Sequence, residues 1–151
     1  MPASGGNEMS VVGIDHASFP TMQPEEMIAF YKRLGFEIVG EEEWRSGKRP
    51  VFWVQAGHSK LSIHGPALYS DANFTLRGPT AKPGCADVCF EWAGSIESAV
   101  ALIRNAGAEI VEGPVPRSGG RTGHAMHVMN ASSVYTRDPD GNLLEFLTYR
   151  P

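Results

Sequence analysis

The chain has 151 residues, of which 42% are hydrophobic and 20% are charged, so it is long enough for one globular domain with a sizeable core. Its net charge is -4 and its Lys and Arg residues are scattered, which argues against nucleic acid as the main partner. No apolar run is long enough to span a membrane, so we expect no membrane partner.

Residues 1–10 are small and polar and contain no apolar stretch of the kind found in signal peptides, so we interpret them as a disordered tail. Cys85 and Cys89 are four residues apart in an alternating apolar segment. On a strand both would point to one face, too far apart to form a disulfide. Reduced thiols favour a cytoplasmic protein.

The first half of the chain, residues 11–66, has the pattern of one strand, one helix and three further strands. Residues 11–19 are apolar and predict a strand. Pro24 followed by two acids begins a helix, and Gly35 ends it. The three further strands are predicted at residues 36–44, 50–56 and 60–64.

The second half, residues 84–149, repeats this order after a polar linker at 67–83 that is rich in Gly and Pro. Ser95 can cap a helix over residues 96–104, and Gly107 ends it. Residues 113–131, rich in Gly, Pro, Arg and His, are predicted to be a long loop. The predicted strands are residues 86–92, 109–112, 133–137 and 143–148.

The two halves also match residue by residue. Leu34-Gly35-Phe36-Glu37-Ile38-Val39 aligns with Ala106-Gly107-Ala108-Glu109-Ile110-Val111. A slip of one residue aligns His16 with Asp87, and the last strands of the halves place His64 opposite Glu145. The chain is therefore predicted to be an α+β protein of two βαβββ modules, although a chance match of strand–helix–strand patterns is the alternative.

The last hairpin carries the first sign of chemistry. Asp138-Pro139-Asp140-Gly141-Asn142 is a tight turn, because Pro fixes φ, Gly tolerates positive φ and the acids can bond their own backbone. The strand that follows carries Glu145 between Leu144 and Phe146. A carboxylate is costly to bury without a partner, so Glu145 faces either water or a cation.

Four residues of ligand type occupy the first and last strands of the two halves: His16, His64, Asp87 and Glu145. Taken singly, each is explained as a core, surface or turn residue. Related by a pseudo-twofold axis, the four would meet around one divalent metal, for which nitrogen and oxygen donors favour Zn, Ni, Mn, Fe or Co over Ca or Mg. Without a thiolate a structural zinc site is not expected, and open positions would serve Lewis-acid catalysis.

The predicted loop at 113–131 supplies weaker candidates. Arg117 and Arg121 could bind a substrate carboxylate or phosphate, or be solvated loop charges. His124 and His127 could ligate a metal, although a solvated or lid segment is the favoured interpretation. Arg117, Arg121 and His124 are the predicted substrate-binding residues.

Three segments resemble the vicinal oxygen chelate superfamily of glyoxalase I, bleomycin resistance proteins and extradiol dioxygenases. They are Ile14-Asp15-His16, residues 30–36 and residues 137–145, and the resemblance covers about residues 11–149. Residues 83–90 and 112–117 resemble more narrowly the branch of glyoxalase-domain-containing protein 5 and the virulence-associated glyoxalase-like proteins. The resemblance implies paired modules, a cupped sheet around one metal held at His16, His64, Asp87 and Glu145, and a homodimer.

The resemblance implies a lyase or isomerase that chelates two vicinal oxygens of a small-molecule substrate and moves a proton through Glu145 or Asp87. Glyoxalase I has a glutamate at the position of His64 and a histidine or glutamine at that of Asp87. The shorter Asp87 can therefore either ligate the metal or orient His16. A ring-cleaving dioxygenase and a drug-binding resistance protein without turnover are the alternatives.

Overall fold

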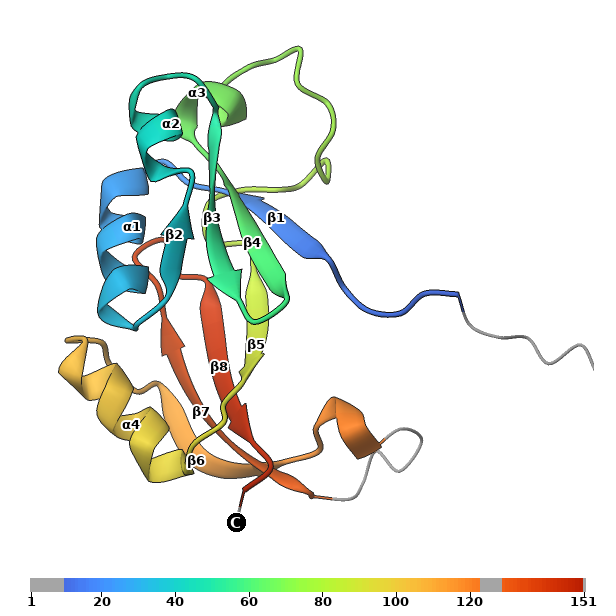
Figure 1. The fold of residues 1–151 in the computed structure, drawn as a ribbon, viewed down its shortest axis with the longest axis vertical. Helices are drawn as coiled ribbons and strands as arrows, with labels where there is room; N and C mark the ends of the chain where they lie inside the picture. The colour runs from blue at the N-terminus through green and yellow to red at the C-terminus, as the bar shows by residue number, and fades with distance from the viewer. Residues whose placement is uncertain (1–9, 123–128, 151) are drawn as a thin grey trace, which may run out of the picture.

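The computed structural model describes residues 10–122 and 129–150, and shows two four-stranded sheets, one from each half of the chain (Figure 1). In the first, the strand order is β1-β4-β3-β2, and in the second it is β5-β8-β7-β6. The edge strands β1 and β5 run parallel to β4 and β8, and the other pairs are antiparallel. The predicted α+β fold of two βαβββ modules is therefore confirmed.

The first module contains the elements β1 (His16–Pro20), α1 (Pro24–Arg33), β2 (Glu37–Val39), α2 (Glu41–Arg45), β3 (Val51–Ala56), β4 (Ser59–His64) and α3 (Pro66–Tyr69). The second contains β5 (Asp87–Glu91), α4 (Ile96–Asn105), β6 (Glu112–Arg117), the 3-10 turn η1 (Gly120–Thr122), β7 (Ala131–Arg137) and β8 (Leu143–Thr148). As predicted, Pro24 begins α1, and the Ser95 hydroxyl caps α4 by accepting from the Ser98 amide at 3.2 Å.

The two long helices lie on the same side of the molecule, α1 against the first sheet and α4 against the second (Figure 1). The opposite faces of the sheets carry neither of these long helices, and we call them the helix-free faces. The core between the helices and the sheets is continuous across the modules. Phe36, from the first module, has its ring centroid 4.8 Å from that of Phe90 and 6.4 Å from that of Phe146. Gln23 adds a polar contact, since its amide nitrogen donates to the Pro139 carbonyl and to Asp140 Oδ1, both at 2.8 Å.

Two predicted strands are shorter than expected. The first begins at His16 rather than at residue 11, and Val12 is fully exposed. Its ladder partner β4 begins at Ser59, so the residues before His16 have no strand to pair with. The second ends at Val39, because Gly40 adopts φ 80° and the acidic run that follows forms α2.

The predicted loop at 113–131 was wrong in its first part, which forms β6 and pairs with β7. Its prolines, Pro114 and Pro116, argued against a strand in the sequence, but β6 lies at the edge of its sheet, where a missing N–H is tolerated. The predicted tail at 1–10 lies almost wholly outside the described residues, as do His124 and His127. No described helix has the length and apolar character needed to cross a bilayer.

Candidate metal site

The strand registers decide which side chains point to the helix-free faces. In the first module Phe19 pairs with Ile63, and both are buried in the core. Because side chains alternate along a strand, the residues on the other face are His16 and Ser18 from β1 and Lys60, Ser62 and His64 from β4.

The same register in the second module relates the two halves. Phe90 pairs with Phe146 as Phe19 pairs with Ile63, and Cys89 pairs with Glu145. The counterpart of Cys89 is Ser18, whose partner is Ser62. Ser62 rather than His64 is therefore the structural counterpart of Glu145, and the predicted alignment of His64 with Glu145 is wrong by two residues. A shift of two residues preserves the inward–outward alternation, so hydrophobic pattern alone could not detect it.

His16 keeps its predicted equivalence to Asp87 and is oriented by its neighbour. The carboxylate Oδ1 of Asp15 lies 2.6 Å from Nδ1 of His16 and accepts a hydrogen bond from its N–H, which leaves Nε2 free for a ligand. This hydrogen bond and the charge of the imidazole lower the pKa of Asp15. A carboxylate on the far nitrogen is the usual support of a metal-ligating histidine. Sequence reasoning missed Asp15, although it directly precedes His16.

Asp87 and Glu145 form an acidic pair on the second sheet. They stand on neighbouring strands, two residues apart in register, so their Cα atoms are about 8 Å apart and their side chains project from the same face. Glu145 is half-buried, and its Oε1 accepts a hydrogen bond from the Ser133 hydroxyl at 2.5 Å. Asp87 is exposed at the free edge of the sheet.

Two neutral groups flank Glu145 in the neighbouring strands, Cys89 in β5 and Tyr135 in β7. Burial, reinforced by the charge of Glu145, raises the pKa of the Cys89 thiol to about 12. Burial also raises the pKa of Tyr135, more than the hydrogen bond from Arg117 lowers it. At neutral pH the two groups that flank Glu145 on the neighbouring strands are therefore protonated and uncharged.

The two arginines predicted to bind substrate are engaged with protein atoms. The Nε of Arg117 donates to the Tyr135 hydroxyl at 2.8 Å, and its terminal nitrogens contact the Pro116 carbonyl and Glu112. Arg121 forms an ion pair with Glu91 and lies over the Tyr149 ring, 4.5 Å from its centroid.

The four predicted ligands do not converge within one chain. His16 and His64 stand at opposite ends of the β1–β4 ladder, four residues or about 13 Å apart, and the acidic pair lies on the other sheet. Among the described residues, no three His, Cys, Asp or Glu side chains lie close enough together to hold a metal ion. A pocket of about 670 Å³ lies between the two modules, and of the four ligands only Asp87 lines it.

This architecture defines a class: duplicated βαβββ proteins whose helix-free sheet faces carry imidazole and carboxylate groups. The chain belongs to the Glyoxalase/Bleomycin resistance protein/Dioxygenase superfamily, whose model matches residues 13–146. The family resemblance predicted from the sequence is thereby confirmed.

Known proteins extend this relationship. Virulence protein STM3117 of Salmonella typhimurium (strain LT2) is 36% identical over 143 residues, which cover 94% of this chain and 88% of that protein. Its crystal structure superposes with a TM-score of 0.75 at 32% identity and covers 94% of this chain and 100% of that one. Glyoxalase domain-containing protein RDO1 of Mycosarcoma maydis is 30% identical over 95% of this chain and 72% of its own length. A lactoylglutathione lyase from Agrobacterium tumefaciens shares the fold, with a TM-score of 0.64 at 19% identity and coverage of 93% and 96%.

Proposed function

We propose that this protein is a divalent-metal-dependent lyase or isomerase whose metal site is completed by a second copy of the chain. His16 of one copy and Asp87 and Glu145 of the other would hold the ion. The observation that carries the proposal is the pairing of structural equivalents. An imidazole with its Nδ1 bound to Asp15 occupies the position on the first sheet that Asp87 occupies on the second.

The free edges of the two sheets support a homodimer. Within the described chain, β1 and β5 each pair with one strand only, and their other edges carry unpaired backbone groups. Open edges of this kind are templates for pairing with another chain. Three apolar residues before β1 are exposed, Val11 by 72%, Val12 by 100% and Ile14 by 76%, and a partner would cover them. In the proposed dimer, the first module of one copy would join the second module of the other, and His16 would meet the acidic pair there.

The donor set fits a divalent transition metal. One imidazole and two carboxylates suit Mn, Fe, Co, Ni or Zn, and the supply of oxygen donors is too small for the six to eight ligands of calcium. When bound, the ion would supply Lewis-acid polarisation of two vicinal substrate oxygens.

Glu145 and Asp87 are the residues proposed to transfer the proton. The Ser133 hydroxyl holds one oxygen of Glu145, which leaves the other oxygen to take a proton from the substrate and return it. Tyr135 and Cys89, both protonated beside Glu145, keep negative charge from building up around it. Asp87, exposed at the edge of the sheet, is the alternative base if it does not ligate the metal.

The register weighs against the oxygenase alternative. Non-haem iron oxygenases use two histidines and one carboxylate, whereas the equivalent positions here supply one histidine, one serine and two carboxylates. Binding of a drug-like ligand without turnover would need no metal at all. Metal content therefore separates the second alternative from the proposal.

The decisive experiment is complementation between His16→Ala and Glu145→Ala. Each variant alone, purified as a full chain and analysed for metals, is expected to lose the ion, whereas Glu97→Ala on α4 keeps it. When the two defective chains are unfolded, mixed and refolded, about half of the dimers should contain one chain of each kind. One of the two sites in each mixed dimer is intact, so about a quarter of the parent metal content should return. Full metal content in either single variant would overturn the ligand assignment, and no recovery on mixing would overturn the shared site.

A further inference from the structure

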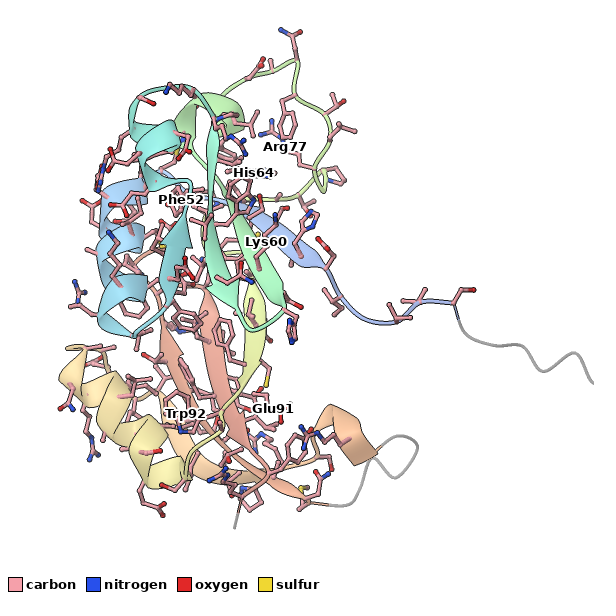
Figure 2. The ribbon with its side chains drawn as sticks, viewed as in Figure 1. Phe52, Lys60, His64, Arg77, Glu91 and Trp92 are labelled. Carbon is pink, nitrogen blue, oxygen red and sulfur yellow. The ribbon has the colours of Figure 1, made fainter. Side chains whose placement is uncertain are left out.

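The segment that follows β4, residues 66–82, begins with the short helix α3 and lies on the side of the first module that faces away from α1 (Figure 1). It is attached through aromatic and cationic contacts. The ring of Phe74 stands edge-on to the imidazole of His64, with centroids 5.5 Å apart. The guanidinium of Arg77 lies 5.4 Å from the ring centroid of Tyr69 and 5.7 Å from that of Phe74. Figure 2 shows Arg77 reaching back from this segment toward the end of β4, where His64 lies.

The imidazole of His64 packs against Phe74 but forms no side-chain hydrogen bond within the described residues. The residue is only 9% exposed, yet its ring nitrogens are not among the buried side-chain atoms that lack a partner. A ring nitrogen at the edge of a largely buried imidazole can give a directed hydrogen bond to a bound group. The strand register shows that Ser62, not His64, is equivalent to Glu145, so His64 is not expected to ligate the metal.

Burial, together with the charge of Arg77, lowers the pKa of His64, so Arg77 is the cation that acts on this imidazole. One terminal nitrogen of Arg77 donates a hydrogen bond to the Tyr69 carbonyl at 2.7 Å. None of the ion pairs within the described residues involves Arg77. Arg77 and Lys82 together line a neighbouring cavity of about 430 Å³, which has no acidic residue in its lining and which His64 does not line.

We propose that Arg77 and His64 form an anion subsite that binds a carboxylate or phosphonate group of the substrate. A planar guanidinium fork recognises both groups, and the ring nitrogen of His64 adds a directed hydrogen bond. The inference rests on the proposed function, because it assumes that the substrate is chelated near His16. His64 lies four residues along the ladder from His16, about 13 Å, so the substrate is an elongated anion whose acidic group stands several bonds from its chelating oxygens.

The test uses protein stripped of metal on a chelating resin, with acetate and methylphosphonate as separate probes. The Hε1 resonance of His64, assigned by its loss in His64→Gln, is followed by NMR as each probe is added. We expect saturable movement of this resonance with at least one probe, and affinity weaker by about tenfold or more in Arg77→Met. Arg77→Lys should restore part of the affinity. Arg104→Met, which removes an exposed cation from α4, is the matched control and should bind as the parent does.

Preference for one probe identifies the anionic group as carboxylate or phosphonate. A His64 resonance that neither probe moves, or equal affinity in the parent and Arg77→Met, would overturn the subsite. Amide dispersion in the same spectra reports whether each variant is folded. If Arg77→Met does not fold, Arg77→Lys, which keeps the positive charge, is compared with the parent instead. Arg77→Met should keep the parent metal content, so failure of the anion subsite and failure of the metal site give different results.

Discussion

The hydroxyl of Tyr31 donates a hydrogen bond to Oδ2 of Asp138 at 2.9 Å and so joins helix α1 of the first module to the β7–β8 turn of the second. Both residues are buried. Asp138 also orders the turn, because its Oδ1 accepts from the backbone amides of Asp140 and Asn142, each at 3.0 Å. Burial raises the pKa of Tyr31 well above its ordinary value, and the neighbouring carboxylate adds to this effect, so the phenol remains the donor. The turn that closes the last hairpin is thus also a joint between the modules.

Tyr31→Phe tests this joint. The substitution keeps the ring in its edge-on contacts with Phe30 and Phe36 but leaves a buried carboxylate short of one donor. Oδ2 of Asp138 still accepts from the Asn142 side chain, so the variant loses one of two hydrogen bonds to this oxygen. We expect the free energy of unfolding to fall by about 1–3 kcal/mol, the usual worth of a hydrogen bond to a charged group, as measured by urea denaturation. Tyr69→Phe is the control, because its hydroxyl has no partner among the described residues, and it should unfold as the parent does. Equal midpoints for Tyr31→Phe and the parent would mean that the bond contributes nothing.

The duplicated architecture was predictable from the sequence because each element carries a local signal. Pro24 begins α1, Gly107 follows α4, and the Asp-Pro-Asp-Gly-Asn turn precedes β8, and each feature depends on backbone chemistry within a few residues. Helix α2 was missed because residues 36–44 were predicted as one strand, and Gly40 was not recognised as the residue that ends it.

The candidate site was predictable only in part, because it depends on pairing between distant strands. His16 and Asp87 matched through their local contexts, and the registers of β1 and β5 retain that match. His64 was misaligned because a shift of two residues leaves the same face pointing outward. The separation of His16 from the acidic pair depends on how the modules pack, through contacts such as Phe36 with Phe90, and no local signal encodes these.

The carboxylate of Asp15 is predicted to tune metal affinity without touching the ion. Asp15→Ala removes the acceptor that holds Nδ1 of His16 and so frees the imidazole to rotate and change tautomer. Loss of such a partner typically weakens metal binding 10- to 100-fold, and we expect a change in that range by competition with a chromogenic chelator. The control is Asp71→Ala, which removes an exposed carboxylate from the segment after α3. Unchanged affinity in Asp15→Ala would show that His16 is not a ligand or needs no support.

The two thiols are predicted to differ in reactivity although both are exposed. Alkylation requires the thiolate, and partial burial of the Cys89 thiol, together with the charge of Glu145, raises its pKa to about 12 even though the residue has exposed surface. At pH 8 iodoacetamide should therefore modify Cys85 well before Cys89, as read by peptide mass spectrometry. Glu145→Gln removes the neighbouring charge and should speed modification of Cys89 while leaving Cys85 unchanged. Equal rates at both cysteines of the parent would contradict the proximity of Cys89 to the carboxylate.

His64 is predicted to make stability depend on pH. Burial, with a smaller effect of the Arg77 charge, lowers the pKa of His64, so between that pKa and the ordinary value of about 6.5 the unfolded chain binds a proton that the folded chain does not. Stability therefore rises with pH across this window and is lost as the pH falls through it. In metal-free protein, the urea midpoint should drop between pH 7.5 and pH 5.5, and His64→Gln should make this drop smaller. His58→Gln, which removes an exposed imidazole from the β3–β4 turn, should keep the drop of the parent. If both substitutions alter the drop equally, the imidazole of His64 is not shielded from solvent as the structure has it, and the anion subsite loses its buried donor.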